Sequence, residues 1–251
     1  MSGKRAPEQS HRGHWERLRR RFTQDGLAGF HDYEVIELLL TLGRERGDVK
    51  PQAKAAIKEF KSVRGVLDAS AEELQAISGI GPASAFVIKL ARALAEYYYG
   101  EKVQRSDGPL ASPREVVDFL RVSMGSLERE TFCVVYLDAQ NRPRAKPETL
   151  FEGTLTSSAV YPREILRRAL ALNAASMIFA HNHPSGCVEP SEHDRTITRE
   201  LVLDANLMEI GVLDHIIVGA DAHFSFADHG LIREYARQAK DFQESRIRRA
   251  T

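Results

Sequence analysis

The fourteen-residue stretch HNHPSGCVEPSEHD, from His181 to Asp194, begins with two histidines one residue apart and ends with an aspartate, residue types that bind metal ions. His181 and His183 are one residue apart at the end of ASMIFAHNH, an apolar stretch with the composition of a β-strand. Side chains two residues apart in a strand leave the same face, so the two imidazoles would point in one direction. This spacing predicts two histidine ligands that converge on one ion.

A carboxylate could complete this group from the helix that follows. Pro184 and Gly186 indicate a sharp turn, after which Asp194 would lie in the first turn of a helix. Two histidines and one carboxylate with an open fourth position are typical of a catalytic zinc site, whereas structural zinc sites are usually closed by cysteine thiolates. Ser191 and Asp194 also fit a Ser-x-x-Asp capping box, which would only complete the N-terminus of that helix. The motif alone leaves both interpretations open.

The composition is that of an ordinary globular protein. Hydrophobic residues make up 43% and charged residues 28% of the 251 residues, with 35 Lys plus Arg against 35 Asp plus Glu. The longest apolar run, around Val35 to Leu40, is far shorter than the ~18 residues of a membrane span, so we expect no membrane contact. There is no secretion-signal pattern at the start, and the two cysteines, Cys133 and Cys187, give no disulfide framework. These features favour a reduced cytoplasmic setting.

The pattern along the chain predicts two domains. Residues 13–100 are periodic as in helices almost throughout, and a charged, turn-rich stretch follows. After it, β-branched strands alternate with helices, which indicates an α/β or α+β domain around a central sheet. We expect a helical domain over residues 1–100, a linker over 101–112 and a sheet domain over 113–251.

Particular residues mark the expected ends of these elements. Prolines at 51, 82 and 162 would open helices, and glycines at 43, 100 and 211 would close them. The expected strands are ETFCVVYLDAQN, ETLFEGTLTS, ASMIFAHNHPSG and VLDHIIVG.

The spacing from His181-x-His183-Pro184 to Ser191-x-x-Asp194 resembles the signature of the JAMM (MPN+) metalloproteases. The wider stretch GTLTSSAVYPREIL through HNHPSG to VLDHIIVG and SFADHGLI resembles the RadC family within that superfamily. DYEVIELLLTLG and LQAISGIGPASAFVIKLA resemble the N-terminal domain of the same family. The resemblance covers roughly residues 15–235 and implies a JAMM (MPN) domain with a central mixed β-sheet flanked by helices, preceded by an all-α helix-hairpin-helix-like domain.

The resemblance also implies a set of functional residues. It makes His181, His183 and Asp194 the ligands of Zn²⁺ in a metallopeptidase that hydrolyses an amide, peptide or isopeptide bond through a zinc-activated water. Glu130, which opens the first expected strand, would be the general base. The hydroxyl of Ser191 would help to hold the oxyanion that develops on the scissile carbonyl.

Some assignments stay open. Glu128 is a near neighbour of Glu130 with the same strand parity, and Glu152 in LFEGTL is a rival for the role of general base. His215 belongs to the family pattern, but its position inside an expected strand favours a structural role. Cys187 departs from the polar residue of many relatives and is no family ligand.

The helical half raises an alternative function. ISGIGPASAFVIKLA resembles a helix-hairpin-helix, whose glycine turn and helix N-terminus can accept a DNA phosphate without reading sequence, with Lys89 further along the second helix. Gly79 and Gly81 could equally serve only to let two helices approach. Residues 1–105 hold 18 Lys plus Arg against 14 Asp plus Glu, which suits nucleic acid but also ordinary solvated helices.

The main alternative is therefore a DNA-binding repair or recombination accessory protein with a vestigial metal site. A metal-dependent nuclease, which the string HNH suggests, is a further one. The expected partners are a protein or peptide substrate and DNA, and nothing in the sequence names the substrate or the oligomeric state.

Overall fold

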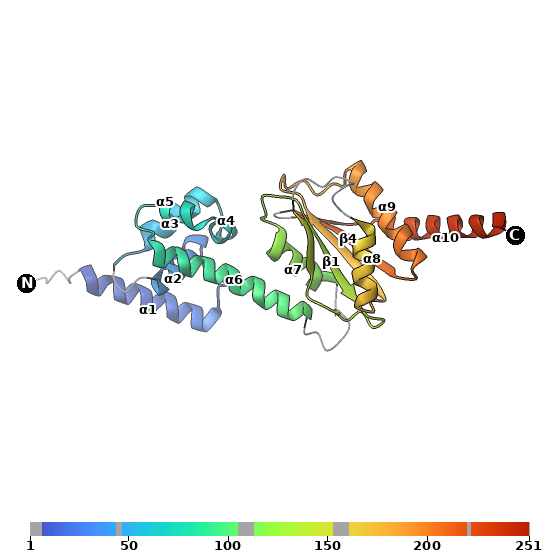
Figure 1. Ribbon diagram of the computed structural model, residues 1–251. Coiled ribbons are helices and arrows are strands. Elements are labelled where there is room, and N and C mark those ends of the chain that lie inside the picture. Colours follow the sequence, from blue (N-terminus) through green and yellow to red (C-terminus); the bar gives the residue numbers. More distant parts are fainter. Residues whose placement is uncertain (1–6, 44–46, 105–112, 153–160, 220–221, 251) are drawn as a thin grey trace, which may run out of the picture. The chain divides into compact units, whose positions relative to one another are not determined.

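The structure, a computed structural model, describes residues 7–43, 47–104, 113–152, 161–219 and 222–250 (Figure 1). The chain separates into two compact units, Met1–Ala95 and Glu96–Thr251, and the division falls inside helix α6 (Pro82–Gln104). In the described part of the chain, no helix is both long and apolar enough to cross a membrane.

The first unit is a small all-helical core. Besides the beginning of α6 it contains α1 (Pro7–Asp25), α2 (Asp32–Leu42), α3 (Lys50–Phe60), α4 (Val63–Asp68) and α5 (Ala71–Ala76). Apolar side chains from α2, α3, α5 and α6 are fully buried together, among them Ile36, Ala53, Leu74 and Ile88. The predicted helix ends at Gly43, Pro51 and Pro82 are confirmed, since α2 stops just before Gly43 and the two prolines lie in the first turns of α3 and α6.

The turn between α5 and α6 requires glycine at one position. Gly79 has a φ of +87°, and a Cβ there would lie 2.4 Å from Nε2 of Gln52. The left-handed backbone strongly favours glycine here, and a larger residue would also require the Gln52 side chain to move. The ammonium group of Lys89 donates to the carbonyl oxygens of Leu67 at 3.0 Å and Ala69 at 2.7 Å, so it closes the C-terminal end of α4 rather than projecting from the hairpin.

The predicted helix end at Gly100 is wrong, because α6 continues through it to Gln104. Gly100 does not have a positive φ, so it lacks the left-handed conformation with which a glycine ends a helix. It is therefore an interior residue of α6 and not a stop signal. The rest of the expected linker, residues 105–112, lies outside the described residues.

The second unit is built on a mixed five-stranded sheet in the order β2-β1-β3-β4-β5. Its strands are β1 (Thr131–Leu137), β2 (Glu148–Glu152), β3 (Ser176–Asn182), β4 (Gly211–Val218) and β5 (His223–Ser225). β1 is antiparallel to β2 and β3, β3 and β4 are parallel, and β4 and β5 are antiparallel. The expected central mixed sheet flanked by helices is confirmed. The expected second strand is present up to Glu152, and its remainder lies outside the described residues.

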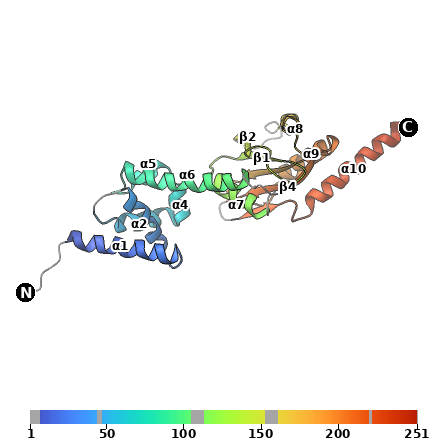
Figure 2. The ribbon, with the colours of Figure 1, turned by 90° about the horizontal axis from the view of Figure 1, so that it is seen from below.

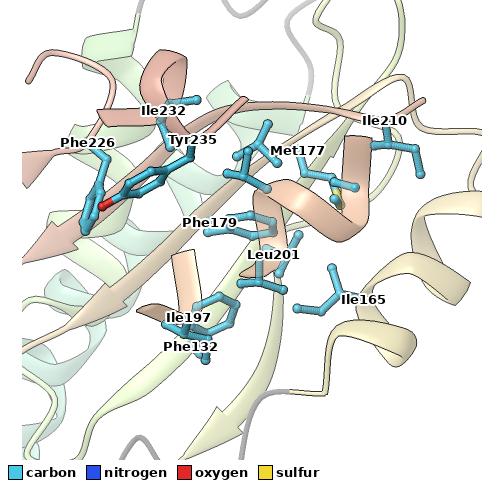
Figure 3. Close-up of a cluster of buried hydrophobic side chains, with 14 of the residues drawn as sticks. Phe132, Ile165, Met177, Phe179, Ile197, Leu201, Ile210, Phe226, Ile232 and Tyr235 are labelled. Atoms are coloured by element: carbon cyan, nitrogen blue, oxygen red, sulfur yellow. The ribbon is translucent and has the colours of Figure 1, made fainter. Parts of the chain in front are cut away.

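Helices cover both faces of this sheet, so the central strands are buried throughout (Figure 1). Phe132, Phe179 and other residues of one face pack against α8 (Pro162–Ala171), α9 (Glu192–Leu207) and the first turns of α10 (Leu231–Ala250) (Figure 3). On the opposite face of the sheet, Cys133 and the other buried apolar residues pack against α7 (Pro113–Met124). Beyond these turns, α10 runs away from the sheet, as Figure 2 shows.

Gly211 was expected to end the helix before it, and this prediction is also wrong. Helix α9 ends at Leu207, Glu209 takes the left-handed conformation with φ of +58°, and Gly211 is already the first residue of β4. A Cβ on Gly211 would be 3.4 Å from Cβ of Ser176 in the neighbouring strand. This is an ordinary contact distance, and Gly211 does not take the left-handed conformation of a glycine that ends a helix.

The two cysteines should react very differently with thiol reagents. Cys133 is buried in β1, and this burial raises the pKa of its thiol to about 12, whereas Cys187 is exposed. We expect a maleimide to label the native protein at Cys187 alone, and to label both residues after denaturation. Mass spectrometry of the labelled protein measures this, and a Cys187→Ser variant that still labels rapidly in the native state would contradict the fold.

Candidate metal centre

Strand β3 brings the two predicted histidine ligands to one end of the sheet. His181 lies in the strand and is 1% exposed, and His183 follows directly after it. The backbone N–H of His183 donates to the carbonyl oxygen of Val218 at 3.0 Å, which prolongs the parallel pairing with β4 by one step. Both imidazoles are thus held by a strand, and their Nε2 atoms are 3.0 Å apart.

The turn after the histidines fixes the orientation of the second ring. Gly186 has a φ of +77° and donates its N–H to the carbonyl oxygen of His183 at 2.9 Å. This turn brings the carbonyl oxygen of Cys187 to 2.6 Å from Nδ1 of His183. A carbonyl oxygen can only accept, so Nδ1 carries the proton and the lone pair of this ring lies on Nε2.

Helix α9 supplies the third side chain of the cluster. Asp194 lies in the first turn of α9 and is 4% exposed. Its Oδ1 is 3.2 Å from Nε2 of His181, and its Oδ2 is 3.5 Å from Nε2 of His183. The convergence that the sequence predicted for these three side chains is therefore present.

The predicted capping box is also present. The motif therefore brings three possible metal ligands together and also completes the N-terminus of α9. The Ser191 hydroxyl accepts from the backbone N–H of Asp194 at 3.1 Å and donates to its Oδ2 at 2.6 Å. The backbone N–H of Ser191 also donates to Oδ2, at 2.8 Å. Ser191 therefore orients the Asp194 carboxylate, and a role at an oxyanion stays a prediction.

The spacing and the types of donor atoms fit a zinc ion. Ligands at the usual zinc distances of ~2.0–2.1 Å, arranged as a tetrahedron, are separated from one another by about 3.3 Å. The two Nε2 atoms are 3.0 Å apart, and Asp194 presents one oxygen to each ring, with Oδ1 3.2 Å from His181 and Oδ2 3.5 Å from His183. Lone pairs of two imidazoles and a carboxylate that face one another repel unless a cation or a proton lies between them. His181, His183 and Asp194 can accordingly hold a metal ion.

The cluster keeps its carboxylate ionised. Burial alone would raise the pKa of Asp194, but the nearby imidazoles of His181 and His183 hold that pKa far below the ordinary value. Burial lowers the pKa of His181, whereas the nearby carboxylate of Asp194 raises that of His183. A negative carboxylate beside a neutral buried imidazole is the state in which both act as ligands.

Glu130 lies near the cluster. It directly precedes β1, is partly exposed, and its negative charge contributes to raising the pKa of both His181 and His183. Glu128 is exposed and is not among the main causes of either shift. The side chain of Glu152 lies outside the described residues. The structure thus brings Glu130 into the electrostatic range of the ligands.

Asn182, between the two histidines, binds through its side chain to the backbone of the segment that carries Glu130. Its Oδ1 accepts from the backbone N–H of Thr131 at 2.8 Å, and its Nδ2 donates to the carbonyl oxygens of Leu127 and Arg129, both at 3.1 Å. Asn182 therefore links the start of β1 to the end of β3 by hydrogen bonds. The role of Asn182 was not predicted, although an amide in an otherwise apolar strand is a visible signal for it.

Two further polar residues behind His181 are fully buried. His215 in β4 lies with Nε2 2.8 Å from Nδ1 of His181, and its own Nδ1 is 2.6 Å from Oγ1 of Thr198 in α9. Burial lowers the pKa of His215 well below the ordinary value. His215 lies inside a strand, as predicted. Thr198 was not predicted from the sequence, although a hydroxyl on the apolar face of a helix was a visible signal.

Comparison with known proteins gives matches over both halves of the chain. Residues 110–231 match the family model described as a RadC-like JAB domain, and residues 12–86 match the model of a UPF0758 N-terminal domain. A UPF0758 protein of Pseudoalteromonas translucida is 42% identical over 217 residues, which are 86% of this chain and 96% of the relative. A UPF0758 protein of Burkholderia cenocepacia is 42% identical over 220 residues, which are 87% of this chain and 85% of the relative.

The purified protein should bind a single zinc ion through this cluster. Asp194→Asn should weaken binding because a charged ligand is replaced by a neutral one, whereas Ser191→Ala should keep the metal and lose about 1 kcal/mol of helix capping. Glu192→Gln is the matched control, since Glu192 is an exposed acid in the same helical turn. Competition titration with a chromogenic chelator measures the affinities. Equal zinc content in a His181→Ala, His183→Ala double variant would refute the site.

Proposed function

This chain belongs to the family of RadC-like UPF0758 proteins, and from this membership we infer that it is a zinc-dependent hydrolase of the JAMM type. The reaction is the hydrolysis of an amide, peptide or isopeptide bond. The observation that carries the proposal is the convergence of His181, His183 and Asp194, with a protonated Nδ1 that turns the lone pair of His183 inward.

The cluster has the composition of a catalytic site. It offers three protein ligands of the imidazole and carboxylate types, as in zinc hydrolases, and the thiol of Cys187 is not a member. A zinc ion held there would supply Lewis acidity, which polarises a carbonyl and lowers the pKa of water towards ~7. The protein contributes the orientation of the ligands and a dry environment around His181 and Asp194, which are both buried.

Glu130 is the proposed base. Its carboxylate takes a proton from the attacking water, while the water oxygen forms a bond to the carbonyl carbon of the substrate. When the carbon–nitrogen bond breaks, Glu130 returns that proton to the leaving amine. The products are a carboxylic acid and an amine, with one water molecule consumed, and Glu130 ends in its starting state.

Ser191 has a proposed role on the substrate side. Its hydroxyl proton is directed at Oδ2 of Asp194. To stabilise an oxyanion, that proton must rotate to the oxygen of the scissile carbonyl, while the backbone N–H of Ser191 continues to hold Oδ2. The exposed position of Ser191 leaves it accessible to a substrate.

A Glu130→Gln variant tests the chemistry separately from metal binding. The amide keeps the shape of the side chain but cannot accept the proton of water, so turnover should fall by ~10²–10⁴-fold while zinc occupancy stays at the parental level. Peptide and isopeptide libraries provide the substrates, and mass spectrometry detects the cleaved products.

Glu128→Gln is the matched control, because the same change is made two residues away on an exposed side chain, and it should leave turnover unchanged. Parental turnover in Glu130→Gln would disprove this choice of base and make Glu152 the next residue to test. Cleavage of DNA by the same preparation, with peptide substrates left intact, would instead identify a nuclease.

A further inference from the structure

A row of hydrogen bonds leads from His181 into the interior of the protein. Nδ1 of His181 meets Nε2 of His215, Nδ1 of His215 meets the hydroxyl of Thr198, and that hydroxyl meets the main-chain carbonyl oxygen of Asp194. The side chains of His181, Thr198 and His215 are each at most 1% exposed. The row thus begins at one predicted metal ligand and ends at the backbone of another.

The Asp194 carbonyl oxygen, the last member of the row, determines which atom donates in each of its hydrogen bonds. The Asp194 carbonyl oxygen has no proton to give, so the Thr198 hydroxyl must donate to it. A hydroxyl has one proton, and therefore Thr198 presents only a lone pair to His215. Nδ1 of His215 must then carry a proton and donate it to Thr198.

The same reasoning continues through His215. A fully buried imidazole without a carboxylate among its hydrogen-bond partners is neutral, because an isolated charge is costly to bury. A neutral ring with its proton on Nδ1 has a lone pair on Nε2. Nδ1 of His181 must donate to that lone pair. In the neutral His181 ring, the remaining lone pair lies on Nε2, the atom that faces His183 and Asp194.

We propose that Thr198 and His215 are positioning residues that fix the tautomer of His181, so that its Nε2 presents a lone pair to the metal. This proposal concerns the protein's own protons, and its consequence for catalysis rests on the proposed zinc hydrolase function. His183 obtains the same tautomer from the carbonyl oxygen of Cys187. The two ligands are set by different elements, one by helix α9 and strand β4, the other by the turn.

Three aromatic rings pack around the ring of His215. Phe226 stacks on it with ring centroids 5.1 Å apart, and Phe132 and Phe179 contact it edge-on at 5.7 and 6.0 Å. These rings offer no alternative acceptor for a ring N–H in its plane. In the observed orientation both ring nitrogens of His215 have polar partners, and a ring turned over would exchange them for apolar surroundings.

Nuclear magnetic resonance of the wild-type, metal-free protein tests the proposal directly. Long-range ¹H–¹⁵N spectra distinguish the two nitrogens of each histidine, and single histidine substitutions assign the signals. At a pH well above the ordinary histidine pKa of about 6.5, we expect a proton on Nδ1 of both His181 and His215, and none on Nε2 of His215. A proton on Nε2 of His215 would overturn the proposal, whatever the protein binds or cleaves.

A pair of variants at Thr198 tests the consequence for the metal. In Thr198→Val the hydroxyl is lost, His215 can place its proton on Nε2, and the proton of His181 then moves to the nitrogen that should bind the ion. Zinc affinity should fall by about 10–100-fold, as for other residues that support a metal ligand. Thr198→Ser keeps the hydroxyl and should bind zinc like the parent, and equal affinities of the two variants would refute the role.

These measurements separate the two proposals. A parent protein that binds no zinc would end the proposed hydrolase function, while the tautomers of His181 and His215 would still decide the positioning role. Thermal unfolding of both Thr198 variants shows whether they are folded. If the valine variant is not, the wild-type spectra alone decide the matter.

Discussion

The parallel pairing of β3 with β4 is the interaction on which the rest of the centre depends. It sets His181 beside Ile217 and Phe179 beside His215, and its prolongation by the N–H of His183 holds the second ligand. A shift of register by a single residue would turn these side chains to the opposite face of the sheet. The buried strand pair is thus a specific support for the cluster, and α9 needs to add only one carboxylate and one hydroxyl to it.

The ligand motif could be predicted from sequence because its geometry is local. Alternation in a strand places His181 and His183 on one face, and a capping box places Asp194 in the first turn of α9, so neither requires knowledge of distant contacts. The order of helices and strands followed from periodicity for the same reason. The errors at Gly100 and Gly211 have a common origin, since neither glycine takes the left-handed conformation with which a glycine ends a helix.

The row behind His181 could not be predicted in this way. The pairing of β3 and β4 contains an irregularity after Met177, where Val212 pairs with Met177 and Asp214 with Ile178. Leu213 is therefore an extra residue that changes the alternation within β4 and lets Val212 and His215 face the same core. Nothing in the letters VLDHIIVG reveals that change, and Thr198 meets His215 only because a helix and a strand pack together.

The capping box of α9 also bears on how this site could change in the course of evolution. Because Ser191 and Asp194 stabilise the start of the helix through hydrogen bonds to each other, the fold does not rely on a cation for that purpose. A relative with asparagine at position 194 would keep a capping side chain and lose only the negative charge. A lineage could therefore abandon catalysis by a single substitution and retain a well-folded protein, free to be selected for binding alone.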